Sequence, residues 1–168
     1  MDYFLGDPFC DPPGEEANFT EQILRLPQTH LCFTPSERFR PYEHLQRTPH
    51  ENVVFASFNN FAKITDAMLT AWGEILRAVP TARLLLKNVH PLKETLTRMK
   101  VRAVQAGIDP ARLELQPGSK DYLADYLDAD VILDTFPYQG VGTTCEALCM
   151  GLPVVVRAGT RHGARFGV

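Results

Sequence analysis

The chain has 168 residues, enough for one ordinary domain with its own hydrophobic core. Hydrophobic residues make up 45% and charged residues 22%, which is typical of globular proteins, and a formal net charge of −3 argues against broad electrostatic contact with nucleic acid. No apolar run approaches the roughly 18–20 residues of a membrane span, and the start MDYFLGDPF lacks the basic stretch of a signal peptide. We therefore expect a cytoplasmic protein that binds neither nucleic acid nor a membrane.

The first 50 residues contain seven of the 13 prolines and lack a sustained periodic pattern. We expect a short helix over residues 18–26 and a strand at HLCFT, residues 30–34. Residues 35–51 are polar and bounded by prolines, which is typical of a linker. The predicted parts of the chain are therefore residues 1–34, the linker 35–51 and a main domain, residues 52–168.

In the main domain, short apolar runs alternate with helical patterns. The runs predict strands at 53–58, 83–87, 112–116, 130–134 and 153–156. The helical patterns predict helices at 64–79, 92–107, 120–129 and 143–150. Thr65 is a candidate N-cap of the first helix, and Gly107 is expected to end the second. Strands that alternate with helices predict an α/β fold with a Rossmann-like, doubly wound parallel sheet.

The four cysteines do not have the spacing of a metal or redox site. Cys10, Cys32, Cys145 and Cys149 include no C-x-x-C pair, and Cys145 and Cys149 lie four residues apart on one expected helix. We expect buried, reduced packing residues and no metal.

Ligands of a doubly wound sheet bind outside the carboxyl ends of its strands. The loops expected there suit an anion: residues 57–63 end at Lys63, and residues 135–144 are rich in glycine and lead into a helix. The loop at residues 157–165 contains arginines and a histidine but no acidic residue. The chain has no G-x-G-x-x-G or Walker loop, which argues against NAD and ATP.

Two hydroxyls and a carboxylate begin the expected helix at 143–150. The Thr143 and Thr144 hydroxyls could donate to phosphate oxygens, and Glu146 could accept from ribose hydroxyls. Equally, either threonine could only cap the helix, and Glu146 could only complete a capping box or favour the helix dipole. The residues by themselves leave both interpretations open.

Several stretches together resemble a known family. FNNFAKITDAMLTAWGEILRAVPTARLLLK (58–87), GIDPARLEL (107–115) and DVILDTFPYQGVGTTCEALCMGLPVVVRAGTRHGARFG (130–167) are similar to the C-terminal catalytic lobe of O-linked N-acetylglucosamine transferases, in particular their bacterial and Spindly-like branch. The opening 35 residues resemble the end of the N-terminal catalytic lobe. The resemblance implies a GT-B glycosyltransferase, with residues 1–34 from the N-terminal lobe and residues 52–168 forming a C-terminally incomplete nucleotide-sugar-binding lobe.

The resemblance also implies roles for individual residues. It places Lys63, Asn60, Thr143 and Thr144 at the donor diphosphate and Glu146 at the ribose. It places the base in the loop that carries Ser119, Lys120 and Tyr122, and the candidates for further contacts on the phosphate side are Arg161, His162 and Arg165. No catalytic residue is assigned, because the family's proposed catalytic histidine belongs to a part of the N-terminal lobe that this chain lacks.

The implied function is inverting transfer of N-acetylglucosamine from UDP-GlcNAc to Ser or Thr of proteins, without a metal or other cofactor. The implied partners are the nucleotide sugar, the protein acceptor, the rest of the N-terminal lobe and the tetratricopeptide repeats of a full-length enzyme; the fragment alone is expected to be inactive. One alternative is another donor such as GDP-fucose, or a GT-B enzyme that acts on glycans. The other is a catalytically silent module that binds a nucleotide or a partner.

Overall fold

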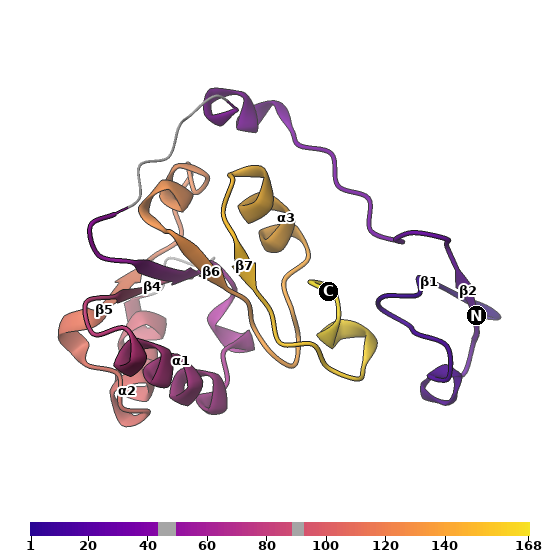
Figure 1. Cartoon of the computed structure of the whole chain (residues 1–168), viewed down its shortest axis with the longest axis horizontal. Coiled ribbons are helices and arrows are strands. Elements are labelled where there is room, and N and C mark those ends of the chain that lie inside the picture. The colour runs from indigo at the N-terminus through magenta and orange to yellow at the C-terminus, as the bar shows by residue number, and fades with distance from the viewer. Residues whose placement is uncertain (44–49, 89–92) are drawn as a thin grey trace.

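The computed structural model describes residues 1–43, 50–88 and 93–168. Within these ranges, an all-parallel five-stranded sheet has the order β5-β4-β3-β6-β7 (Figure 1). Its strands are β3 (Val54–Ser57), β4 (Arg83–Lys87), β5 (Leu113–Gln116), β6 (Val131–Leu133) and β7 (Val154–Val155). Each strand lies within its expected range, so the predicted α/β fold with a doubly wound sheet is confirmed.

Helices cover both faces of this sheet. α1 (Asp66–Ala78) and α2 (Lys93–Gln105) pack on one face, and η5 (Ala124–Asp128) and α3 (Gly142–Cys149) on the other (Figure 1). Leu84 and Leu86 belong to the apolar cluster under α1 and α2, whereas Leu85 belongs to the cluster under η5 and α3. This alternation explains why β4 is apolar throughout, since successive side chains of a strand point to opposite faces.

The structure confirms the predicted N-cap of the first helix and the predicted glycine after the second. The Thr65 side chain accepts a hydrogen bond from the Met68 N–H at 3.3 Å and caps α1. Gly107 follows α2 with a φ of +88°, a conformation that glycine adopts without steric cost. Residue 92, at the start of the second expected helix, lies outside the described residues. The helix expected at 120–129 is shorter in the structure, where only Ala124–Asp128 form a helix, the 3₁₀ helix η5.

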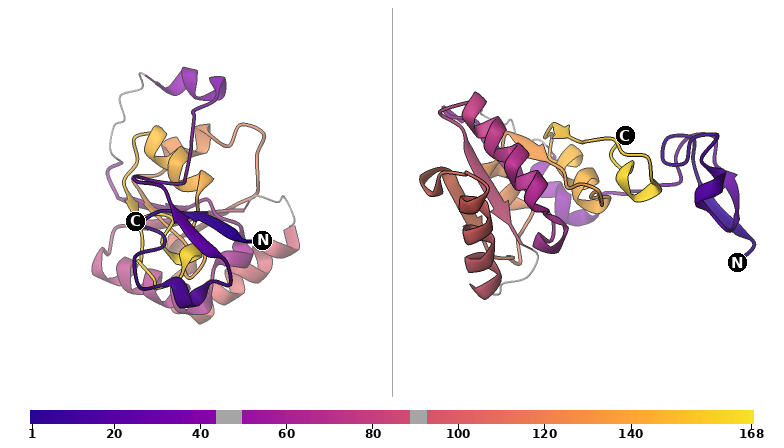
Figure 2. Two further views of the ribbon diagram at one scale, coloured as in Figure 1. Left: turned by 90° about the vertical axis from the view of Figure 1, so that its right-hand side faces the viewer. Right: turned by 90° about the horizontal axis from the view of Figure 1, so that it is seen from below.

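The N-terminal part differs from the prediction. Residues 18–26 do not form a helix; β2 (Gln22–Arg25) pairs in parallel with β1 (Tyr3–Gly6). Residues 30–34 do not form a strand, and the His30 N–H donates to the Asp7 carboxylate at 2.9 Å rather than to a neighbouring strand. In both cases partners distant in sequence decide the backbone conformation. The β1–β2 element lies beside the C-terminal loop of the chain (Figure 2).

The expected linker contains the 3₁₀ helix η2 (Glu37–Tyr42), and its residues 44–49 lie outside the described residues. All four cysteines are free, but Cys10 is the one that is fully buried; Cys32 and Cys149 are exposed, which corrects the expectation of burial. In the described part of the chain, no helix has the length and apolar character needed to cross a membrane. The boundaries proposed between the parts of the chain stay a prediction.

Candidate functional site

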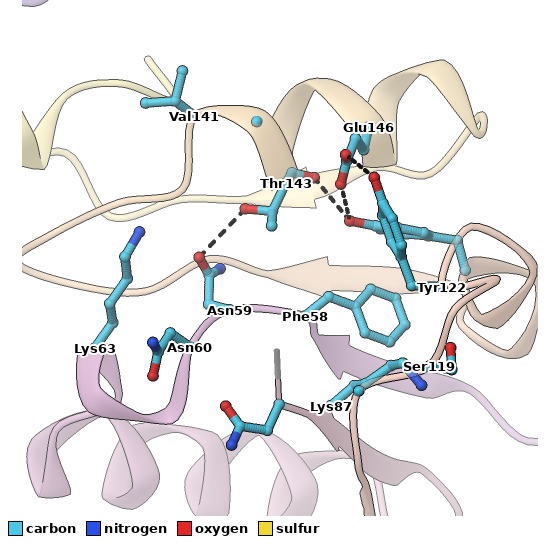
Figure 3. Close-up of a pocket in the computed structure, with 14 residues that line it drawn as sticks. Phe58, Asn59, Asn60, Lys63, Lys87, Ser119, Tyr122, Val141, Thr143 and Glu146 are labelled. Carbon is cyan, nitrogen blue, oxygen red and sulfur yellow. Dashed lines mark hydrogen bonds between the residues drawn. The ribbon is translucent and has the colours of Figure 1, made fainter. Parts of the chain in front are cut away.

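A cavity of about 620 Å³ lies at the carboxyl ends of β3 and its neighbours (Figure 3). The connection that leaves β3 leads to β4 on one side, and β6 pairs with β3 on the other side, so the order in which strands are added to the sheet reverses between β3 and β6. Side chains from the loops after β3, β4 and β5 and from the start of α3 line this cavity. It therefore occupies the place where doubly wound sheets bind ligands.

At one end of the cavity, two phenols hold the Glu146 carboxylate (Figure 3). Tyr122 donates to Oε1 at 2.6 Å, and Tyr126 donates to Oε2 at 3.2 Å. Burial and the neighbouring Glu146 raise the pKa of Tyr122 to about 12, so this phenol keeps its proton at neutral pH. The capping-box interpretation of Glu146 is wrong, because these bonds orient the carboxylate toward η5 rather than toward the start of its own helix.

The loop after β5 closes the same end. Lys87 forms an ion pair of 2.7 Å with Asp125 and donates to the Pro117 carbonyl at 2.9 Å, and Ser119 donates to Asp125 at 2.7 Å. Ser119 and Tyr122 line the cavity, as predicted for the base loop, whereas Lys120 does not. Lys87 and Asp125 hold the loop in place, but neither residue belongs to a recognisable sequence motif.

The 3₁₀ helix η3 (Phe61–Lys63) forms the other end of the cavity. Lys63 Nζ donates to the Gln139 carbonyl at 3.2 Å and lies 4.4 Å from the centre of the Tyr138 ring. Burial lowers the pKa of Lys63, and Asp134 partly offsets this effect. Asn60 caps η3 by accepting from the Ala62 N–H at 3.0 Å. Both predicted residues of this loop, Lys63 and Asn60, therefore line the cavity.

The threonines at the start of α3 have different positions. α3 begins at Gly142 after Val141, and no described side chain caps it, so the capping interpretation of Thr143 and Thr144 is wrong. Thr143 lines the cavity, with its hydroxyl 3.3 Å from Asn59 Oδ1. Thr144 is buried and donates to the Gly140 carbonyl at 2.9 Å, so it fixes the loop instead of facing the cavity.

Asp134 at the end of β6 organises the loop that follows. Its Oδ1 accepts from the N–H groups of Thr135 at 2.8 Å and Gly140 at 2.9 Å, and from the Asn59 amide at 3.2 Å. Burial raises the pKa of Asp134, although these donors and Lys63 oppose the shift. Asp134 and Asn59 are not among the site residues predicted from the sequence; the available signal was a carboxylate directly after a buried strand.

A profile of glycosyl transferase family 41 matches residues 40–166. The chain belongs to this family. Among curated relatives, a probable UDP-N-acetylglucosamine–peptide N-acetylglucosaminyltransferase SPINDLY of Petunia hybrida is 39% identical over 173 residues, covering 100% of this chain and 18% of the relative. The corresponding protein of Arabidopsis thaliana is 38% identical and is covered over 19% of its length. The family 41 chain thus spans under a fifth of the relatives that it matches.

A solved structure agrees with the family assignment. A mutant of Thermobaculum terrenum O-GlcNAc transferase superposes with a TM-score of 0.86 and 37% sequence identity, over 99% of this chain and 32% of that chain. The α/β fold of the family 41 chain therefore matches part of an O-GlcNAc transferase.

The remaining predicted residues of the family 41 chain lie apart from the first cavity. Arg161 and His162 line another cavity, of about 690 Å³, and His162 Nδ1 lies 2.8 Å from Asp11 Oδ1. Arg165 donates to the carbonyls of Phe9 at 2.6 Å and Gly159 at 3.0 Å. In this structure His162 and Arg165 join the C-terminal loop to the N-terminal part, and their predicted phosphate contacts stay a prediction.

Asp7, Cys10 and His30 place potential metal ligands within 4.8 Å of one another. The Asp7 oxygens already accept from the N–H groups of Phe9, Cys10 and His30 and from the Thr29 hydroxyl. Burial raises the pKa of Cys10 to about 12, which disfavours the thiolate that a metal requires. Asp7, Cys10 and His30 therefore form a turn that is held together by hydrogen bonds to the Asp7 carboxylate.

Proposed function

We propose that this chain binds the donor nucleotide of a protein O-GlcNAc transferase, which transfers N-acetylglucosamine from UDP-GlcNAc to Ser or Thr of proteins with inversion. The observation that carries the proposal is a single cavity with an oriented carboxylate at one end and a lysine beside a helix N-terminus at the other. A nucleoside diphosphate has the complementary order, with ribose hydroxyls followed by negative phosphates. Family 41 membership and the activity for which the relatives are named support this choice of ligand.

At the nucleoside end, Glu146 accepts hydrogen bonds from the ribose. The phenols of Tyr122 and Tyr126 hold both carboxylate oxygens, so the acceptor is oriented before the ligand arrives. Each carboxylate oxygen can accept more than one hydrogen bond, and the ribose therefore does not need to displace the phenols. The base lies against the loop of Ser119, Lys120 and Tyr122; Lys120 contributes through its backbone, since its side chain is outside the cavity.

At the diphosphate end, Lys63, the Thr143 hydroxyl and the first turn of α3 contact phosphate oxygens. The N–H groups of a first helical turn have no helical acceptor, and the helix dipole favours an anion there. Asn60 orients η3, and Thr144 fixes Gly140, so both act on the diphosphate through the backbone that they hold. These fixed donors stabilise the charge of the leaving diphosphate without a metal ion.

The N-terminal part belongs, in this proposal, to a second lobe that completes the enzyme. Parallel sheets are normally covered on both faces, yet β1 and β2 expose a row of apolar side chains, with Tyr3 56%, Leu5 54% and Leu24 47% exposed. A further lobe would cover them and supply the acceptor site and the catalytic base. Tetratricopeptide repeats and a cytoplasmic location complete the proposal, and the free cysteines are consistent with a reducing compartment.

Calorimetric titration with UDP and GDP, with and without EDTA, tests the proposal. We expect UDP binding on the order of 0.1–1 mM, or roughly 4–5.5 kcal/mol, that EDTA does not change. Stronger binding of GDP than of UDP would indicate a GDP-sugar donor instead. A folded chain that gives no heat with either nucleotide at millimolar concentration would refute nucleotide binding and favour a partner-binding module.

A lysine variant identifies the diphosphate end. Lys63→Ala should weaken UDP binding by about 1.5–3 kcal/mol, the range for a charge-assisted hydrogen bond. Its thermal stability should change little, because the lost interactions are those with the Gln139 carbonyl and the Tyr138 ring and an electrostatic attraction to Asp134. Lys100→Ala, at an exposed position of α2, is the matched control and should change neither quantity. Parallel loss of binding and stability would give Lys63 a structural role.

A further inference from the structure

The 3₁₀ helix η2 lies against the outer side of the predicted base loop. Arg38 donates to the Lys120 carbonyl at 3.1 Å, and its guanidinium lies 4.9 Å from the centre of the Tyr122 ring. The Tyr42 hydroxyl donates to Asp121 Oδ1 at 3.2 Å. Arg38 and Tyr42, which we call the clamp, thus contact consecutive residues of the loop, although about 80 positions separate them in sequence.

The clamp is attached to the core of the domain. Phe39, between the two clamp residues, is 6% exposed and packs in the apolar cluster that contains Val54 and Tyr126. Its burial fixes η2 relative to β3 and η5. The clamp therefore holds the loop against the apolar core of the domain.

The loop transmits this constraint to the cavity. Tyr122, under the Arg38 guanidinium, is the residue that donates to Glu146 at 2.6 Å. The side-chain contacts of the diphosphate end do not involve the loop, because Lys63 bonds to Gln139 and Thr143 lies against Asn59. Tyr126, which donates to the Thr143 carbonyl at 3.3 Å as well as to Glu146, lies in η5 and not in the loop. A displaced loop would therefore disturb the nucleoside end and leave the diphosphate end in place.

We infer that Arg38 and Tyr42 are positioning residues that preorganise the nucleoside end of the donor site through Tyr122. The inference rests on the proposed nucleotide binding and adds a role for the segment before the main domain. A preformed loop lowers the entropic cost of ordering Tyr122 when the nucleotide binds. Losing the clamp should then weaken binding of a nucleotide but not of a ligand that contains the diphosphate group alone.

The test compares UDP with inorganic pyrophosphate, both followed by ³¹P NMR titration of the 168-residue chain. Arg38→Met combined with Tyr42→Phe should weaken UDP binding about three- to tenfold, as expected for losing a cation–π contact and two exposed hydrogen bonds. Pyrophosphate binding should change less than about twofold. Arg38→Lys keeps a cation and should recover part of the UDP affinity. Arg40→Met is the matched control, because Arg40 lies on the same helix and pairs with Glu37.

Hydrogen exchange of the unliganded chain provides an independent measurement. The double variant should exchange faster than wild type at the backbone amides of residues 118–123, with β3 and β4 unchanged. Equal UDP affinity of the variant and the wild type, equal loss of UDP and pyrophosphate binding, or unchanged exchange in the loop would each overturn the inference. A wild-type chain that binds neither ligand would instead refute the proposed function on which the inference rests.

Discussion

Asp134 shows how one buried side chain shapes the site. Its Oδ1 gathers donors from the following loop and from Asn59, while Oδ2 is buried without a partner among the described residues. Burying a charged oxygen without a donor is unfavourable, and it is one cause of the raised pKa of Asp134. The residue therefore gives the loop its geometry at a cost in stability.

Asp134→Asn should raise the melting temperature at pH 7, because the amide oxygen can keep the donors while the desolvated charge is removed. Since the folded-state pKa of Asp134 is raised, the carboxylate lowers stability above its folded pKa, and this effect fades as the pH falls toward its unfolded value. The difference between variant and wild type should accordingly shrink as the pH is lowered from 7 to about 4. Thermal unfolding followed by circular dichroism at both pH values measures the difference in melting temperature between the variant and the wild type. A variant that is less stable at pH 7 would show that Oδ2 has a partner, such as an ordered water.

At the scale of one element, α3 presents neighbouring hydroxyls to different surroundings. A helix turns by about 100° per residue, so adjacent side chains cannot face the same surface. Thr143 faces the cavity, and Thr144 faces Gly140 in the interior. One threonine therefore bears on ligand binding and the other on the conformation of the preceding loop.

Substitution by valine should separate these roles. Thr143→Val should weaken UDP binding by about 0.5–1.5 kcal/mol with little change in melting temperature, since it removes a neutral hydrogen-bonding group from the cavity. Thr144→Val should lower the free energy of unfolding by about 1 kcal/mol and affect UDP less than Lys63→Ala does. Titration calorimetry and urea unfolding of both variants measure the two quantities. The reverse pattern would contradict the positions seen in the structure.

The N-terminal element formed by β1 and β2 depends on the buried carboxylate of Asp7. Burial by itself would raise the pKa of Asp7, but the N–H groups of Cys10, His30 and Phe9 and the His30 side chain lower it well below its ordinary range. A lowered folded-state pKa stabilises the element fully above the unfolded pKa and progressively less as the pH falls below it.

We therefore expect amide exchange in β1 and β2, corrected for intrinsic rates, to be constant from pH 7 to 5 and to accelerate as the pH falls below about 4. The main sheet should keep its protection over more of this range. Asp7→Asn should exchange fast at neutral pH already and show a flatter dependence. An element as well protected at pH 3 as at pH 7 would mean that Asp7 does not hold it.

At the scale of the whole molecule, the described residues that line the first cavity are candidates for contact with a leaving diphosphate, and no histidine is among them. His162 lies in a loop at the carboxyl ends of the strands, yet its ring contacts Asp11 and not the first cavity. The position for an acceptor hydroxyl and a route for its proton are therefore expected in the rest of the longer enzyme.

The isolated 168-residue chain should show no measurable transfer or hydrolysis of UDP-GlcNAc or GDP-fucose. A protein extended to both complete lobes should transfer sugar to peptide. Radiolabelled sugar on a mixed Ser/Thr peptide pool would be counted in both samples. Robust turnover by the short chain, abolished in His162→Ala, would show that this lobe carries its own base.

The sequence by itself determined the α/β fold of the main domain and the loops that line the candidate cavity. Apolar runs at β3 to β7 and helical patterns between them reflect burial on the two faces of a sheet, which is a local property of the chain. The same holds for Thr65 and Gly107, whose effects reach only a few residues. Because ligands of such a sheet bind outside the carboxyl ends of its strands, the loops with Lys63 and Thr143 were also identified, and the structure places β3 and β6 side by side.

Tertiary structure alone decided the features that depend on distant partners. Residues 22–25 became a strand because β1 was available for pairing, against a local pattern that fits a helix. The Glu146 carboxylate is oriented by hydrogen bonds from tyrosines about 20 positions away. The Thr144 hydroxyl points into the interior because it donates to the Gly140 carbonyl. The His162 ring forms a hydrogen bond with Asp11, which lies 151 positions earlier in the chain. Such hydrogen bonds leave no periodic signal in the sequence, since their energies depend on where the whole fold brings each donor and acceptor.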